Sequence, residues 1–175
     1  MRTARRAFRA AVLAGALIFL AGCPYSSDVP LGDPASAVID RALPGTWRSE
    51  DPETHEKFTL TFASFNGHEM VGFSSEGEGK PISAFRLFVT PVGGERFLNV
   101  QELKDDSAPQ WYLARYRVSG DTLSLRLVDD GLFGSKTFSS PQALQEFVAS
   151  RLADPRLFGS PQDETPDMVL TRVPK

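Results

Sequence analysis

The sequence predicts a mainly β domain in which an antiparallel meander closes, or nearly closes, into a barrel. Apolar and polar residues alternate along several short runs, as they do in half-buried strands. Short turn signals such as Asn66-Gly67 and Gly93-Gly94 separate these runs. Only residues 140–153 change to helical spacing, and one further strand follows them. A meander this long has open edges unless it closes, so we expect a barrel.

The first 22 residues have the features of an export signal. Four arginines lie among the first nine residues, and an apolar block from Ala10 to Leu20 follows them. This block has about half of the roughly 20 apolar residues that a transmembrane helix requires. We therefore expect residues 1–22 to be a signal peptide that is removed on export.

The signal ends in Leu20-Ala21-Gly22-Cys23, which contains the single cysteine of the chain. This stretch resembles the lipobox of bacterial lipoproteins. The resemblance implies cleavage between Gly22 and Cys23, a diacylglyceryl group on the Cys23 thiol and an acylated amino terminus. The next residue is Pro24, not the aspartate that retains enterobacterial lipoproteins in the inner membrane. The resemblance thus implies an outer-membrane protein that faces the periplasm.

Charge and cysteine content limit the partners of the mature chain. The signal holds four of the 19 basic residues and none of the 22 acidic residues, which leaves a net charge of −7. An acidic chain is unsuited to nucleic acid and to electrostatic docking on anionic lipid. The expected membrane contact is therefore made by the acyl chains on Cys23. With that cysteine acylated, no thiol remains for a disulfide or a metal site.

The mature chain divides into an anchor segment and one domain. Residues 23–33 hold the lipidated cysteine and a stretch rich in Pro, Ser, Asp and Gly, which predicts a flexible tether. A single domain is expected over 34–175. Asp33-Pro34 is a typical N-cap and first helical position, so we expect a short helix from there to about Ala42.

The period changes to two after Pro44, and a meander of about seven strands is expected, followed by one helix and a last strand. The helix begins at Ser140-Pro141, and its apolar face includes Leu144 and Val148. Asp154-Pro155 ends it, because the residue before proline avoids the helical region. The expected strands begin at 46 and cover about 57–62, 68–75, 85–90, 97–102, 111–118, 123–127 and 168–173.

Gly45-Thr46-Trp47 opens the first of these strands, after the short helix and before the meander. At this point the chain resembles the lipocalins and the wider calycin barrels. The resemblance covers most of 34–175 in element order but only three residues in motif. It implies that Trp47 closes the base of the barrel and that Arg172 is the arginine that packs on it. The Thr-Asp-Tyr signature of that family is absent.

No residue pattern predicts catalysis, a metal or a cofactor. His55 and His68 are the only histidines, and the expected strands do not bring them together. Ser74 does not fit a nucleophile elbow, because Glu76 stands where glycine is required. Gly134-Ser135-Lys136 differs from a phosphate loop, since a serine separates the glycine from the lysine. We expect a protein that is not an enzyme.

Leu132-Phe133-Gly134-Ser135, before the expected helix, recurs as residues 157–160 after it. Two alternatives are open for this repeat. Both turns tuck under the helix, or together they form an exposed apolar patch that binds a partner.

Two functions remain open for the domain. In the first, the barrel is a non-catalytic interaction or scaffold module of the cell envelope, with a solid core. In the second, its interior binds a small apolar ligand such as a fatty acid. An eight-stranded barrel is just wide enough for its own side chains to fill it, so large inward residues favour the first. The residues expected to face inward, and thus the candidate ligand-binding residues, are Phe58, Phe62, Phe85, Leu87, Leu98, Leu113, Leu123 and Leu125.

Overall fold

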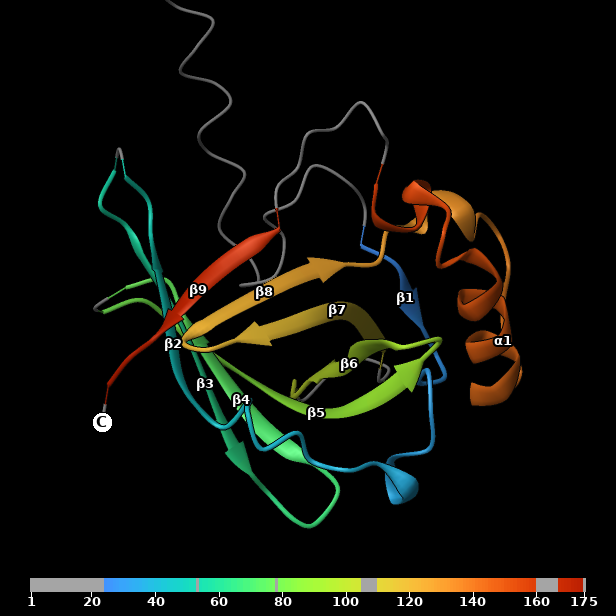
Figure 1. Cartoon of the computed structure of the whole chain (residues 1–175), viewed down its shortest axis with the longest axis horizontal. Coiled ribbons are helices and arrows are strands. Elements are labelled where there is room, and N and C mark those ends of the chain that lie inside the picture. Colours follow the sequence, from blue (N-terminus) through green and yellow to red (C-terminus); the bar gives the residue numbers. More distant parts are fainter. Residues whose placement is uncertain (1–23, 53, 78, 105–109, 160–166, 175) are drawn as a thin grey trace, which may run out of the picture.

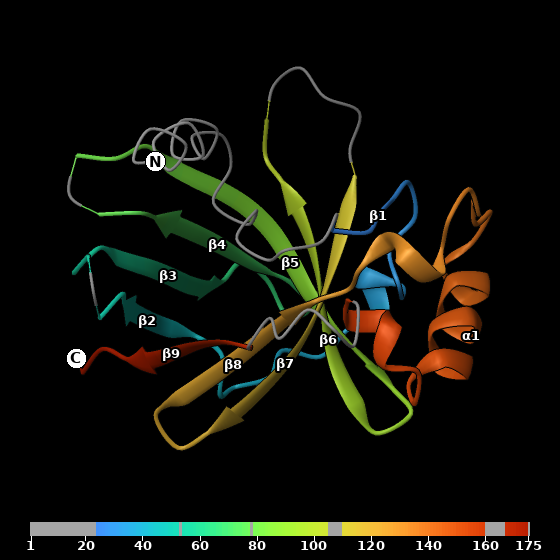
Figure 2. The ribbon, with the colours of Figure 1, turned by 90° about the horizontal axis from the view of Figure 1, so that it is seen from above.

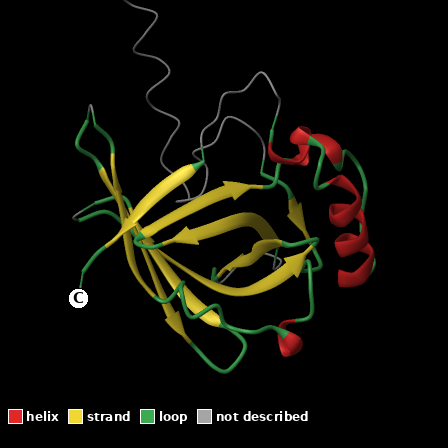
Figure 3. Cartoon of the chain, viewed as in Figure 1, coloured by secondary structure: helices red, strands yellow, loops and turns green. Residues whose placement is uncertain are grey.

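The computed structural model shows a closed antiparallel barrel of eight strands, β2 to β9, with one α-helix outside it (Figure 1). It describes residues 24–174 except 53, 78, 105–109 and 160–166. Strands make up most of the regular structure (Figure 3), which confirms the prediction of a mainly β barrel. The barrel strands are β2 (Gly45–Glu50), β3 (Lys57–Ser64), β4 (Met70–Ser75), β5 (Ile82–Val92), β6 (Glu95–Glu102), β7 (Trp111–Ser119), β8 (Thr122–Leu127) and β9 (Met168–Arg172).

The barrel is a meander that its last strand completes. Each strand from β2 to β8 pairs with the next strand along the chain. β9 then lies between β8 and β2, with Leu170 opposite Leu123 and Arg172 opposite Trp47. Closure leaves no unpaired edge in the ring formed by β2 to β9. An open meander of this length would have two such edges, which can pair with other chains.

The turns differ in how far their sequence determines them. Gly93-Gly94 joins β5 to β6 as a two-residue turn, and both glycines have the positive φ that a type I′ turn requires. At Asn66-Gly67 the expected two-residue turn is wrong. The link there covers 65–69, and the Asn66 Oδ1 atom accepts the N–H groups of His68 and Glu69. The asparagine side chain thus organises a longer loop in place of the glycine-dependent turn.

The anchor segment is docked on the barrel. The Tyr25 N–H donates to the Val128 carbonyl oxygen at 2.9 Å, and β1 (Ser26–Ser27) pairs with the start of β7. Tyr25 is 6% exposed and Leu31 is fully buried. The expected flexible tether is therefore wrong for residues 24–33, because these two apolar side chains bury themselves against the barrel. Cys23 lies outside the described residues.

The short helix expected over 34–42 is reduced to one 3-10 turn, Pro34–Ser36. Asp33 caps it as predicted, accepting the Ala35 N–H. The chain is extended again at Ala37, whose carbonyl oxygen accepts a hydrogen bond from the His68 ring. Tertiary burial overrides the local helix signal here, since the following residues carry Leu43 into the barrel core.

The helix α1 (Pro141–Arg151) begins and ends close to its expected bounds. Ser140 caps it, with its Oγ atom accepting the Ala143 N–H at 3.2 Å. The helix lies outside the barrel, on the side away from β2, β3 and β9 (Figures 1 and 2). Its buried face packs in a second apolar cluster that includes Phe133 and Leu157. Both copies of the repeated turn therefore tuck under the helix, the first of the two alternatives.

The strand wall separates two apolar clusters. The inner cluster fills the barrel, and the outer one joins α1 and the docked anchor segment to the outer faces of β6 and β7. The inner cluster comprises Leu43, Trp47, Leu60, Phe62, Met70, Phe85, Leu87, Val89, Leu98, Val100, Ala114, Tyr116, Leu123, Leu125 and Leu170.

Gly72 makes room for the Phe85 ring inside the barrel. The two residues are cross-strand partners on β4 and β5. A Cβ atom at position 72 would overlap Cε2 of the Phe85 ring. The small residue is thus required by the large one opposite it.

Gly72→Ala is expected to lower the free energy of unfolding by about 1–3 kcal/mol, the usual cost of overpacking a core. Gly67→Ala is the matched control, because nothing lies within 4 Å of a Cβ atom there. Urea denaturation of the purified chain measures both. Equal midpoints for the two variants would contradict this account of the core.

Candidate functional site

The barrel interior is occupied by the protein's own side chains. None of the fifteen buried residues of the inner cluster is more than 8% exposed. Six of the eight residues expected to face inward belong to this cluster: Phe62, Phe85, Leu87, Leu98, Leu123 and Leu125.

The other two predicted inward residues are not among these fifteen, and only Leu113 lies outside the barrel interior. Phe58 is only half-buried and packs against the inner cluster. Leu113 belongs to the outer cluster under α1, so its assignment to the interior is wrong. On β7 the alternation is displaced by one residue, and Tyr112, Ala114 and Tyr116 face inward. The sequence around Leu113 is apolar on both faces, which conceals this alternation.

Ser74 is the one buried side chain in the described part of the chain whose polar atom has no hydrogen-bond partner. It is 2% exposed and shares the inner face of β4 with Gly72. A nucleophilic serine requires a base within hydrogen-bond reach. Because its Oγ atom contacts no such group, Ser74 has no catalytic arrangement around it.

Trp47, Arg172 and Gly45 meet at one end of the barrel. The Arg172 guanidinium carbon lies 4.0 Å from the centre of the Trp47 ring. The guanidinium also donates to the carbonyl oxygens of Pro44 and Ala42, and the Trp47 Nε1–H donates to that of Leu43 at 2.9 Å. These contacts fasten the chain before β2 across the end of the barrel.

Gly45 is fitted to the same contact. Its φ is 137°, and a Cβ atom there would lie 2.6 Å from the Arg172 Nη1 atom. A side chain at this position would both strain the backbone and displace the guanidinium. The glycine is therefore required by the arginine.

Arg172→Lys is expected to lower the free energy of unfolding by about 1–3 kcal/mol, because an ammonium group cannot lie over the ring and donate to two carbonyl oxygens at once. Arg48→Lys is the control, since Arg48 is an exposed arginine on β2. Thermal and urea denaturation measure the difference. A lysine at 172 that leaves stability unchanged would show that this contact does not hold the barrel closed.

Asp40 links the chain segment before β2 to the barrel wall. Its Oδ2 atom accepts hydrogen bonds from the Tyr116 hydroxyl at 2.9 Å and from Arg96. The other carboxylate oxygen accepts the Ala42 N–H. Burial, followed by the hydrogen bond to the Asp40 carboxylate, raises the pKa of Tyr116 far above its usual value.

The raised pKa of Tyr116 predicts a loss of stability at alkaline pH. An unfolded tyrosine ionises at about pH 10, whereas the folded one stays neutral, so its contribution is complete below about pH 10 and falls as the pH rises further. The pKa of Tyr25 is also raised, mainly by burial, and it acts in the same direction. Tyr116→Phe is expected to flatten the alkaline decline of the urea midpoint. Parallel declines in the variant and the parent chain would contradict this assignment.

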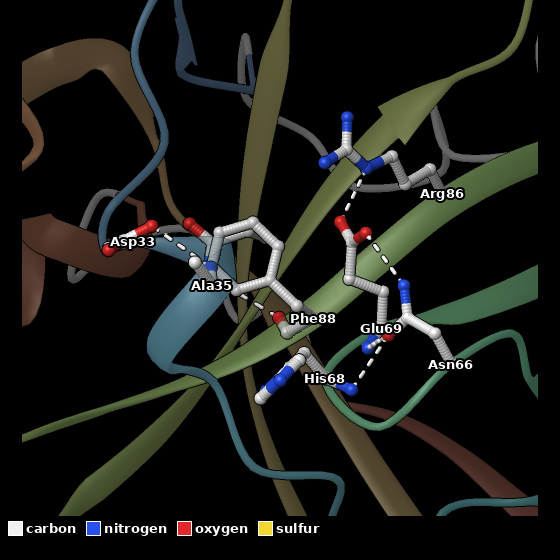
Figure 4. A network of polar contacts seen from close by, with 8 residues as sticks. Asp33, Ala35, Asn66, His68, Glu69, Arg86 and Phe88 are labelled. Atoms are coloured by element: carbon white, nitrogen blue, oxygen red, sulfur yellow. Dashed lines mark hydrogen bonds and ion pairs between the residues drawn. The ribbon is translucent and has the colours of Figure 1, made fainter.

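A second polar network lies on the outer wall (Figure 4). Asn66, Glu69 and Arg86 form a continuous chain of contacts, in which the two Glu69 carboxylate oxygens bond Asn66 Nδ2 and Arg86 Nε. His68 is held next to this network by its bond to Ala37. His55 instead pairs with Glu50, so the two histidines do not meet. In the described part of the chain, no group of three metal-ligating side chains occurs.

A groove of about 1020 Å³ lies outside the barrel. It lies between residues 32–40 and the first turns of α1, with the end of β5 at its base. Val38 projects into solvent there, with 76% of its surface exposed. The other apolar lining residues include Ala37, Ile39, Val89, Pro91 and Pro141.

The charged residues that line the groove are mostly acidic. Asp33, Asp40 and Glu146 contribute carboxylates, and Arg96 is the single basic lining residue. Arg96 is already paired with Asp40. The groove therefore presents apolar contacts beside an excess of negative charge.

Sequence reasoning missed this groove, because the lining residues lie far apart in the chain and share no motif. One signal was available at Asn99, an amide between Leu98 and Val100 in a strand. It is fully buried on the outer face of β6, where its Oδ1 atom accepts the Leu31 N–H at 2.6 Å. A buried polar residue of this kind requires a partner, and it indicates a segment packed outside the barrel.

The chain has no recognised relative in three comparisons. No protein-family model, no curated protein and no solved structure matches it. Within the described ranges, no helix has both the length and the apolar character needed to cross a bilayer.

Proposed function

We propose that this chain is a bacterial cell-envelope lipoprotein, anchored by acyl chains on Cys23, and that its barrel serves as a non-catalytic scaffold for a protein partner. The outer-membrane location, facing the periplasm, follows from Pro24 after the anchor. The proposal includes no cofactor, metal or nucleic acid.

The observation that carries the proposal is the contrast between the inside and the outside of the barrel. Inside, fifteen buried side chains occupy the space that a carrier would leave to its ligand. Outside, the groove between 32–40 and α1 is open and carries an exposed valine. The filled interior and the open groove are both consistent with a solid barrel that binds a partner on its outer surface.

The groove favours an extended segment with apolar and basic side chains. Val38 and Ile39 supply apolar contact, and the surplus carboxylates of Asp33 and Glu146 complement a lysine or arginine. The backbone groups of Val38 and Ile39 have no hydrogen-bond partner within the described part of the chain. An added strand would pair with them by β-augmentation.

Ligand binding in the barrel is the alternative function, and Ser74 is the observation that favours it. Its Oγ atom is buried and has no hydrogen-bond partner. This atom would form a hydrogen bond with a polar group of a small molecule that entered beside the half-buried Phe58. Such a ligand would have to displace side chains of the inner cluster.

The anchor is tested with Cys23→Ser in the full chain, expressed in a bacterium fed a palmitate analogue. The expected result is loss of labelling and accumulation of the unprocessed precursor, since the acylated thiol is absent. Continued acylation of the variant would show that the anchor lies elsewhere.

The groove is tested by photo-crosslinking in living cells, with benzoylphenylalanine placed at position 38 or, as a control, at position 65. Val38 and Phe65 are 76% and 69% exposed, but only Val38 lines the groove. We expect a discrete protein adduct from position 38 alone. Identical adducts from both positions, or none from 38, would contradict a partner in the groove.

A further inference from the structure

The link between β3 and β4 contains the dipeptide Asn66-Gly67, and both residues are exposed. The side-chain Cγ atom of an asparagine can be attacked by the main-chain nitrogen of the next residue, because the two atoms close a five-membered ring. Glycine hinders this attack least, since it has no Cβ atom. The space beside Gly67 is also open, because nothing lies within 4 Å of a Cβ atom built there.

The chain contains two asparagines, and the second one lacks these features. Asn99 is fully buried, and Val100 follows it. Its amide is held on both sides, since Oδ1 accepts the Leu31 N–H at 2.6 Å and Nδ2 donates to the Thr90 hydroxyl at 2.9 Å. Asn99 is therefore a reference within the same molecule for the chemistry of Asn66.

Two backbone N–H groups bind the side-chain oxygen of Asn66. The N–H groups of His68 and Glu69 donate to Oδ1 at 2.7 Å and 2.8 Å. When a nitrogen attacks Cγ, negative charge develops on this oxygen, and donors at such distances stabilise an oxyanion. The Asn66 Nδ2 atom, which would leave, donates to Glu69 Oε2 at 3.3 Å (Figure 4). The loop thus holds the amide in place and polarises it.

We propose that Asn66 is a site of spontaneous deamidation and that the folded loop promotes the reaction. The Gly67 nitrogen forms a bond to Cγ of Asn66, and the bond from Cγ to Nδ2 breaks. The proton of the Gly67 N–H passes through solvent to the leaving nitrogen, so the products are a succinimide and ammonia. Water then opens the ring at either carbonyl carbon, which gives aspartate or isoaspartate. Water is the only co-reactant.

The isoaspartate product would disturb a contact of the groove wall. It adds a carbon atom to the main chain between positions 66 and 67, which shifts the residues that follow. His68 is the next residue, and its ring bonds the Ala37 carbonyl oxygen at 2.8 Å. Because Ala37 lines the groove, the modification would loosen this wall. The modification itself does not depend on the proposed function of the groove.

The experiment incubates the purified, folded chain at neutral pH, with Gly67→Ala as the matched variant. Gly67 has no positive φ and has open space around it, so the fold accommodates alanine there. Peptide mass spectrometry measures loss of each asparagine amide over time. We expect loss at Asn66 to be about tenfold or more faster in the parent chain than in the variant, because a Cβ atom crowds the attacking nitrogen. The Asn99 amide is expected to stay intact. Equal rates at position 66 in parent and variant would overturn the proposal.

The same chain unfolded in urea separates the effect of the loop from the effect of the sequence. Both states contain Asn66-Gly67, but only the folded chain holds Oδ1 against two N–H donors. We expect the folded chain to lose the Asn66 amide faster. Slower loss in the folded chain would show that the loop protects this asparagine and would overturn the proposal.

Hydrogen exchange tests the effect on the groove wall. Exchange of the amides around Ala37 is expected to be about threefold or more faster in the isoaspartate form than in fresh protein. The Gly67→Ala chain, incubated for the same time, is expected to show no such change. Unchanged exchange in a chain that carries isoaspartate would overturn the coupling to the wall. Since no partner is present, this result is independent of what the groove binds.

Discussion

Closure of the barrel by β9 is the constraint on which the rest of the structure depends. Without this strand, β2 and β8 would both be open edges, and the inner cluster would face water between them. The chain reaches this gap only after the long excursion through α1, so local contacts cannot direct it there. Leu170 and the stack of Arg172 on Trp47 provide the contacts that place it. The same arginine bonds the segment before β2, which couples closure to the capping of that barrel end.

The interior of the barrel is occupied by the protein's own side chains. Side chains on the inner faces of neighbouring strands fit one another, as Gly72 opposite Phe85 illustrates. The outer wall instead carries the docked anchor segment and the groove beside α1. In the proposed function, the anchor segment lies at the membrane and the groove binds a partner. The barrel proposed as a scaffold would hold these two surfaces at fixed positions relative to one another.

The sequence predicted the fold better than the surfaces. Alternation and turn residues were sufficient for the strands, since each depends on neighbours in the chain. Leu113 was misplaced because apolar residues occupy both faces of β7, one toward the core and one toward α1. The prediction of a flexible tether over 24–33 was wrong for a related reason. Its composition is that of a linker, but Tyr25 and Leu31 are buried by residues distant in sequence, and no local pattern reveals such a contact.

The central claim is that the barrel is a solid scaffold and not a carrier. Native mass spectrometry of the mature chain, purified gently from the cells that made it, tests this claim most directly. We predict the mass of the polypeptide with its covalent acyl groups and no further mass, before and after fatty acids are offered. An additional mass that disappears on denaturation would contradict the account and identify the barrel interior as a ligand site.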